Sequence, residues 1–351
     1  MSSSTSADGG RLRLAAFVTL LFLAIIPVRA QRTLPLTRTD GHLYAGAMLQ
    51  DSLPVQIMLE SGISFPLIDS ALVWSNPGLF HPEKLDKTVR FRMAAGRNYV
   101  SRYKLAPDLS VAGSRSLCDT YVVDMGGRTD MYYPLNRFTT DSVEMPGIFG
   151  LDIAGYRLEL LAEEDLPGDE SGWTVCDMMR DERSGMYCVQ GPLTLVNDRG
   201  RRTSCPAELV VDLGNAMLLA LFTYKPDVKK FVSRSRVRES EGRTSSGRRL
   251  PVLQPAEVAF MDAYTFCNQP VLSLENPMRL PGHGFLGIRF FERFRVIFDF
   301  RHSRLWIAGS SVAVSADREG RMPSRFLAVA SSADLARPSG ACERYKFINF
   351  R

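Results

Sequence analysis

Short runs of apolar residues, many alternating with polar ones, dominate the chain after its N-terminal segment. Runs of this kind, cut by Gly, Asn, Asp and Pro, are typical of β-strands rather than of long helices. Short helices of about two turns are expected at Asp69–Trp74 and Ile288–Phe294. The pattern therefore predicts a mainly β protein. Its clearest predicted strands are Leu43–Leu49, Val55–Leu59, Val89–Met93, Thr120–Met125, Leu193–Val196, Leu209–Val211, Val258–Phe260 and Val296–Phe300.

The N-terminal segment has a different pattern. Arg11 and Arg13 precede an uncharged, mostly apolar run over Leu14–Val28, and Gln31 follows a small residue. This arrangement is typical of a secretory signal peptide, with an uncleaved anchor as the alternative. We expect an exported protein, periplasmic or extracellular, that begins at or near Gln31. No later stretch reaches the roughly 18 uncharged apolar residues of a spanning helix, so no membrane span is expected after cleavage.

Composition narrows the function classes. The chain has 351 residues, 45% of them hydrophobic, which is enough for one large domain or two ordinary ones. It has 43 Lys and Arg against 38 Asp and Glu, and part of the net charge of +5 leaves with the N-terminal segment. A balance this close to neutral argues against a nucleic-acid partner.

A series of landmarks occurs twice in the same order. In each half, a predicted hairpin runs into an acid, Glu60 or Asp212, that stands 17 residues after an apolar strand residue, Leu43 or Leu195. The repeat predicts a duplicated unit. An alternating basic segment follows each acid, at Val89–Met93 and Ser233–Arg238, and each half then closes on a Gly-apolar-apolar-Gly run, at Gly147–Asp152 and Gly284–Ile288.

On these residues the chain resembles the two-lobed aspartic peptidases of the pepsin and retropepsin kind, over roughly residues 40 to 308. The most specific match runs from Gly284–Gly287 through Phe294–Phe300 to Arg304–Ile307. The resemblance implies duplicated β-barrel lobes, with one acid from each lobe at their interface. The expected organisation is a signal peptide (1–30), a first lobe (31–165), a second lobe (166–310) and a C-terminal extension (311–351).

The chemistry of amide hydrolysis explains why two acids are needed. One carboxylate takes a proton from water, and a neighbouring acid polarises the carbonyl. Two carboxyl groups held together share one proton, as in the aspartic proteases that are the standard example. A glycine two residues after each acid lets backbone amides approach the carboxylates. Glu60 and Asp212 are therefore the candidate catalytic residues, and the candidate binding residues around them are Ser61, Gly62, Leu213, Gly214 and Asn215.

Three positions depart from the family pattern. Glu60 replaces an aspartate, and its extra methylene shifts a carboxylate in a site where about 1 Å of misplacement can cost a hundredfold in rate. Leu213 replaces a hydroxyl residue, so only Ser61 can still bridge the loops, and Asn215 adds bulk. We expect a degenerate site that binds an extended peptide or protein segment. The alternatives are an active endopeptidase with a Glu/Asp dyad and a structural envelope protein.

Two further segments bear on partners. A hairpin that turns near Ala94–Arg97 stands in the flap position, and Tyr99 is the candidate residue over the cleft. The stretch Lys229–Arg249 contains eight Lys or Arg and could hold an anionic partner, although a solvated hairpin face is the simpler interpretation. It has almost no aromatic residues that would stack on bases, which again disfavours nucleic acid.

The cysteines suit an oxidising compartment, because all six follow the signal segment. Cys176 and Cys188 flank a predicted hairpin turn at Asp181–Gly185 and are the one local disulfide candidate, with free buried thiols as the alternative. The four histidines are scattered and no C-x-x-C pair is present, so no metal is expected. Gly282–Gly287 satisfies a dinucleotide pattern, but nearby prolines argue against the strand it needs. No cofactor is expected.

Overall fold

The computed structural model describes residues 32–82, 87–93, 96–103, 109–127, 129–170, 172–243, 249–275 and 280–308. The predicted signal peptide and C-terminal extension lie outside the described residues. Within them, 24 strands join into one mixed sheet with only short helices, as expected for a mainly β protein. No described helix has the length and apolar character needed to span a membrane.

The first half contains twelve strands and the second half the other twelve. The first twelve are β1 (Thr33–Thr39), β2 (His42–Leu49), β3 (Leu53–Glu60), β4 (Leu67–Asp69), β5 (Lys87–Met93), β6 (Gly96–Tyr103), β7 (Ser110–Val111), β8 (Ser114–Arg115), β9 (Thr120–Val123), β10 (Met131–Pro134), β11 (Ile148–Asp152) and β12 (Arg157–Leu161). The others are β13 (Trp173–Arg180), β14 (Tyr187–Val196), β15 (Arg202–Asp212), β16 (Leu219–Leu221), β17 (Arg238–Arg243), β18 (Arg249–Gln254), β19 (Glu257–Phe260), β20 (Tyr264–Cys267), β21 (Val271–Ser273), β22 (Gly284–Gly287), β23 (Arg295–Asp299) and β24 (Arg304–Ala308). All eight predicted strands are confirmed.

Short helices fill the connections. They are α2 (Ser70–Ser75), α3 (Pro77–Phe80), α4 (Pro226–Ser235) and α5 (Ile288–Phe291), with 3₁₀ turns η2 (Leu135–Arg137) and η3 (Glu163–Asp165). The predicted helix at Asp69–Trp74 is confirmed as α2. The Asp69 side chain caps this helix by accepting the Ala71 N–H at 2.7 Å. The helix predicted at Ile288–Phe294 is shorter than expected. The longest helix of the described residues, α4, lies in the basic segment and was not predicted from the sequence.

The two halves repeat one strand arrangement. In the first half, β2 and β3 pair antiparallel, β3 runs parallel to β10, and β10 pairs antiparallel with β4. In the second half, β14 and β15, then β15 and β22, then β22 and β16 pair in the same three ways. The predicted counterpart of Gly284–Gly287 was therefore wrong. The strand in that position is β10, which has no glycine, whereas Gly147–Asp152 overlaps β11.

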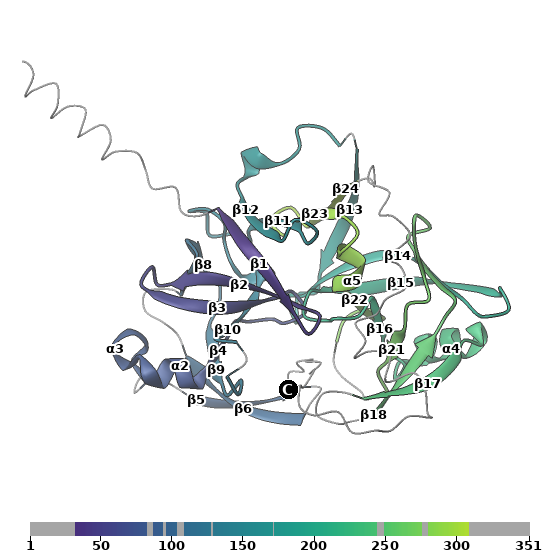
Figure 1. Cartoon of the computed structure of the whole chain (residues 1–351), viewed down its shortest axis with the longest axis horizontal. Helices are drawn as coiled ribbons and strands as arrows, with labels where there is room; N and C mark the ends of the chain where they lie inside the picture. Colours follow the sequence, from purple (N-terminus) through teal and green to yellow (C-terminus); the bar gives the residue numbers. More distant parts are fainter. Residues whose placement is uncertain are drawn as a thin grey trace, which may run out of the picture.

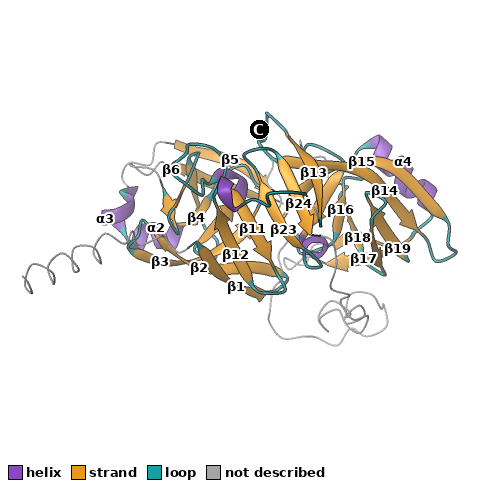
Figure 2. Cartoon of the chain, turned by 90° about the horizontal axis from the view of Figure 1, so that it is seen from above, coloured by secondary structure: helices purple, strands orange, loops and turns teal. Residues whose placement is uncertain are grey.

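β11 and β23 form the seam between the halves. They pair antiparallel, with Gly150 opposite Ile297, and are flanked by β12 and β24. Figure 2 shows β11, β23 and β24 in the middle of the molecule. The largest buried apolar cluster includes Phe149 from one half and Phe298 from the other, so a single core joins both halves.

A hairpin extends from each half. β5 pairs with β6, and β17 pairs with β18, and Figure 1 shows both pairs along the same lower edge of the molecule. The predicted second basic segment, Ser233–Arg238, was wrong as a strand counterpart of β5. Its first residues close α4, and Arg236 ends the helix with a φ of 54°. The strand counterpart of β5 is β17.

The cysteines make no disulfide among the described residues. Cys118, Cys176, Cys188, Cys205 and Cys267 are free, and Cys342 lies outside the described part of the chain. The turn at Asp181–Gly185 does connect β13 to β14, but the antiparallel register places Met179 opposite Cys188. Cys176 instead lies opposite Leu305 of β24, so the predicted Cys176–Cys188 disulfide is wrong.

Candidate functional site

Glu60 and Asp212 end equivalent strands in the two halves. Glu60 is the last residue of β3 and Asp212 the last of β15, and their side chains are 1% and 2% exposed. The apolar residues before each acid are buried, because both strands lie inside the sheet and pair on both edges. Alternating burial along β15 gives way to continuous burial in its last four residues, which brings the carboxylate into the interior.

The structure brings the two acids together at facing loops. A Cβ atom built at Gly214 would lie 2.0 Å from Oε2 of Glu60 and 2.3 Å from its Cδ. A Cβ at Gly62 would lie 2.4 Å from both Cγ and Oδ1 of Asp212. Each carboxyl group therefore occupies space that a side chain on the opposing glycine would fill. Both glycines are required by this close approach.

Ser61 connects the two acid loops through its hydroxyl. Its Oγ donates to the carbonyl of Val211 at 2.9 Å and accepts the N–H of Leu213 at 2.9 Å. The opposing loop has no equivalent, because Leu213 carries an apolar side chain that is fully buried in the core. The clasp between the loops is therefore one-sided, with one hydroxyl making both bonds.

Asp212 is held by backbone amides from both loops. The N–H of Gly214 donates to Oδ1 at 3.0 Å, and the N–H of Gly62 donates from across the interface. Burial disfavours the charged carboxylate more than these amides favour it, and raises the pKa of Asp212 to about 7. A carboxyl group in this environment carries a proton in mildly acidic solution.

Asn215 lies beside the second acid, because its backbone N–H donates to the Asp212 carboxyl. Its Oδ1 accepts the N–H of Met217 at 3.1 Å, and its carbonyl accepts the N–H of Ile288 at 2.9 Å. A Cβ at Gly287 would lie 2.8 Å from Nδ2 of Asn215, so this glycine gives the asparagine its space. The bulk of Asn215 therefore lies against the residue that pairs with Asp212.

The other predicted residues lie elsewhere. Tyr99 lies on β6, opposite Arg90 of the β5–β6 hairpin, and its side chain is outside the described part of the chain. The described residues of Lys229–Arg249 cover most of α4, all of β17 and the first residue of β18, where Arg249 pairs with Glu241 at 3.2 Å. No group of three His, Cys, Asp or Glu side chains among the described residues could hold a metal ion.

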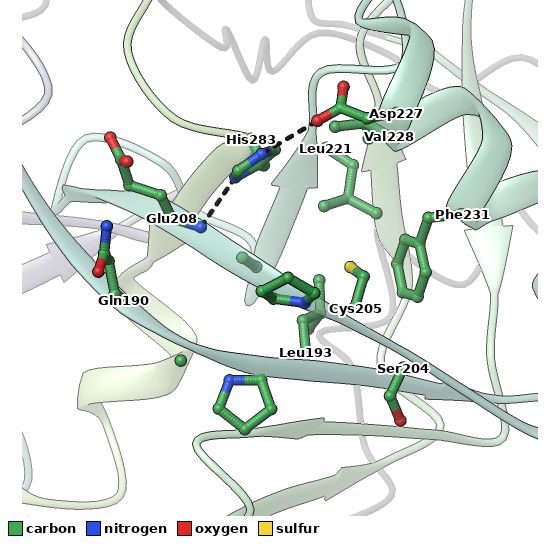
Figure 3. Close-up of a pocket in the computed structure, with 14 residues that line it drawn as sticks. Gln190, Leu193, Ser204, Cys205, Glu208, Leu221, Asp227, Val228, Phe231 and His283 are labelled. Carbon is green, nitrogen blue, oxygen red and sulfur yellow. Dashed lines mark hydrogen bonds and ion pairs between the residues drawn. The ribbon is translucent and has the colours of Figure 1, made fainter.

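A cavity of about 820 Å³ lies in the second half, and neither Glu60 nor Asp212 lines it. Figure 3 shows His283 and Asp227 at its rim and Phe231 at one side. Sequence reasoning missed this cavity because its rim residues, 56 positions apart, form no motif. Only the contact between α4 and the loop before β22 brings them together.

No family model matches the chain, and no curated protein matches it.

Proposed function

We propose that this chain is an exported, two-lobed protein of the aspartic-peptidase kind that binds an extended peptide between its lobes and has an impaired catalytic dyad. The lobes of this proposal are residues 31–165 and 166–310. The observation that carries it is the reciprocal contact of each acid with the opposing glycine, Glu60 with Gly214 and Asp212 with Gly62. A duplicated acid-x-glycine turn with this contact is the arrangement that two carboxyls need to share a proton.

The strand arrangement supports the same proposal. In each half the acid-bearing strand runs parallel to a second strand, with Glu60 opposite Pro134 and Asp212 opposite Gly287. A hairpin from each half lies on the same edge of the molecule (Figure 1). We infer that a peptide adds as a strand to the edge of a hairpin, so that main-chain hydrogen bonds give affinity without demanding one sequence.

Two features argue for impaired catalysis. Oε2 of Glu60 lies 2.0 Å from a Cβ atom built on Gly214, whereas the nearest oxygen of Asp212 lies 2.4 Å from a Cβ atom built on Gly62. The pair is therefore asymmetric, and a symmetric dyad is what holds one water molecule between two coplanar carboxyls. In addition, Leu213 cannot return the hydrogen bonds that Ser61 makes. We expect a loss of orientation from both causes.

The second candidate is an active endopeptidase, and one observation favours it. The pKa of Asp212 is raised to about 7 because the carboxyl is buried. At mildly acidic pH, one proton on the pair of acids then polarises a peptide carbonyl, and the other carboxyl, as a carboxylate, takes a proton from the attacking water. This division of roles requires only the two acids, and its rate depends on how far Glu60 is displaced.

Cleavage of an unfolded protein separates the two candidates. We expect reduced, carboxymethylated casein to bind the unmodified protein and to remain intact at pH 3 to 7. Glu60→Asp with Leu213→Thr restores the shorter acid and the second hydroxyl, and it should produce new N-termini at acidic pH. Glu60→Asp with Leu213→Val is the matched control that lacks only the hydroxyl.

Two results would overturn the proposal. Pepstatin-sensitive cleavage by the unmodified protein, abolished by Asp212→Asn, would establish the active dyad in its place. Absence of both casein binding and cleavage, in the unmodified protein and in the Glu60→Asp, Leu213→Thr variant, would remove the peptide-binding function itself.

A further inference from the structure

The helix α4 lies beside the turn that connects β14 to β15. Figures 1 and 2 both show this helix and hairpin together at one end of the molecule. The buried side chain of Asn197 joins them, because its Nδ2 donates to the carbonyl of Ser235, the last residue of α4, at 3.1 Å. Its Oδ1 accepts the N–H groups of Arg199 and Arg201 at 3.0 and 3.1 Å. One asparagine therefore holds an arginine-bearing turn against the end of the helix.

Both segments expose cations at this end. Val228, Phe231 and Ser235 bury one face of α4, so its Lys and Arg side chains lie on the exposed face. The arginines of the turn are exposed as well. We call the six exposed cations of the turn and the helix the cationic end. They are Arg199, Arg201, Lys229, Lys230, Arg234 and Arg236.

Neighbouring acids leave the cationic end positively charged. None of its six side chains makes an ion pair with another described residue, whereas Glu257 pairs with Arg202 at 3.0 Å and Asp227, in the first turn of α4, pairs with His283 at 3.1 Å. Asp198 is the one acid within the turn. The chain as a whole has 43 Lys and Arg against 38 Asp and Glu, so this end is a local concentration of charge.

The composition and shape of the cationic end indicate its kind of partner. Its one aromatic residue, Phe231, is buried, which leaves no ring to stack on a nucleic-acid base. None of its six cations lines the neighbouring cavity, so that cavity is not a cationic groove for an anionic polymer. Figure 1 shows the β14–β15 hairpin reaching the outer end of the molecule, where a turn and a helix end can meet a flat surface together.

We propose that the cationic end binds the surface of a bilayer that contains anionic phospholipids. Arginine suits this surface because its planar guanidinium donates two hydrogen bonds to phosphate oxygens. The exposed large apolar side chains of the described residues lie elsewhere, so the contact is electrostatic and reversible, without insertion into the bilayer.

The acid loops stay clear of such a surface. β15 extends from Arg202, next to the turn, to Asp212, and its 11 residues span about 33 Å at roughly 3.3 Å per residue. A bilayer bound at the first end of this strand leaves the second end accessible. The proposal therefore does not rest on the proposed function of the two acids.

Co-sedimentation with vesicles tests the proposal. The protein used is the expected mature chain from Gln31 to Arg351, because the apolar segment before it would itself bind lipid. We expect binding to vesicles of phosphatidylcholine with about one third phosphatidylglycerol, and little binding to phosphatidylcholine alone. Binding should be lost as the salt rises from about 0.05 M to about 0.5 M, because salt screens exposed charges.

Two double variants test the location. Each removes two cations of the cationic end and should weaken binding about 25-fold, from about fivefold for each cation near an anionic surface. They are Arg199→Gln with Arg201→Gln, and Lys230→Gln with Arg234→Gln. The matched control is Arg183→Gln with Arg304→Gln, which removes two exposed cations outside the cationic end and should leave binding unchanged. Circular dichroism verifies that each variant is folded.

A pair of single variants tests whether the folded surface, rather than the basic stretch of sequence, binds lipid. Arg234 and Arg249 belong to the same stretch, but Arg249 lies on β18 and pairs with Glu241 at 3.2 Å. Arg234→Gln should weaken binding about fivefold, whereas Arg249→Gln should not. Asp212→Asn should also leave binding unchanged, which keeps this result distinct from any failure of the peptide-binding proposal.

Several outcomes would overturn the assignment. These are equal binding to anionic and neutral vesicles, binding that salt does not weaken, and double variants of the cationic end that bind as well as the control. Binding to soluble polyphosphate, with none to anionic vesicles, would also overturn it and would identify a soluble polyanion as the partner.

Discussion

Replacement of Ser61 by alanine should destabilise the protein far more than loss of one surface hydroxyl. The Ser61 hydroxyl makes two hydrogen bonds across the acid loops, to the carbonyl of Val211 and from the N–H of Leu213, each 2.9 Å long. Ser61 is 2% exposed and Leu213 is fully buried, so water does not replace the lost partner. Leu213 offers no second hydroxyl that could compensate.

The expected magnitude follows from those two bonds. Leaving the buried N–H of Leu213 without an acceptor costs about 1–3 kcal/mol, and loss of the bond to Val211 costs about 1 kcal/mol more. A fall of about 2–4 kcal/mol is a large part of the roughly 5–15 kcal/mol that stabilises a typical domain. It should appear as a lower urea midpoint with an unchanged m-value.

Two variants control this measurement. Ser61→Thr retains the hydroxyl and should lose less stability than Ser61→Ala, and Ser52→Ala removes a hydroxyl from an exposed turn and should change little. The reasoning is refuted if Ser61→Ala lowers the free energy of unfolding by less than about 0.5 kcal/mol, the range of ordinary surface substitutions.

Three further predictions concern the acids and the thiols. Gly214→Ala should destabilise the protein by about 1–3 kcal/mol because the added methyl group overpacks against Glu60, and the loss should be smaller when Glu60→Ala is also present. Gly46→Ala is the control, because nothing lies within 4 Å of a Cβ at that position. An additive double-mutant cycle in urea unfolding would contradict the contact between Gly214 and Glu60. The pKa of Asp212 rises on folding from 3.8 to about 7, so the stability due to its protonated form is complete below pH 3.8 and is lost as the pH rises through 7. The stability of the unmodified protein relative to Asp212→Asn should accordingly fall between pH 4 and 8 in urea titrations, and a difference that rises with pH would show that the carboxyl is not buried as described. The five described cysteines should all react with an alkylating reagent in denaturant without prior reduction, and a smaller number of labelled thiols by mass spectrometry would show a disulfide.

Strand positions followed from local pattern alone. Alternating runs such as Leu43–Leu49 lie on β2, because a half-buried strand alternates apolar and polar residues along its own sequence. The order of landmarks in the two halves also predicts equivalent turns for Glu60 and Asp212. Local periodicity carries this information because it depends only on neighbours along the chain.

Pairing partners did not follow from pattern. Met131–Pro134 pairs with the strand of Glu60, but it contains no glycine, so the Gly-apolar-apolar-Gly pattern points to Gly147–Asp152 instead. A glycine is needed at Gly287 because a Cβ there would lie 2.1 Å from the carbonyl oxygen of Met217 and 2.8 Å from Nδ2 of Asn215, whereas β10 ends on Pro134 in the equivalent position. Whether a position needs glycine depends on side chains that only the folded chain brings near.

By itself, the sequence determined a mainly β chain with two acid-glycine turns and a single bridging hydroxyl at Ser61. The tertiary structure alone decided three other features: the parallel partner of each acid strand, the separation of Cys176 from Cys188, and the cavity between Asp227 and His283. The first set depends on the order of residues along the chain. The second depends on strand register and helix packing, which join residues whose separation in sequence carries no signal.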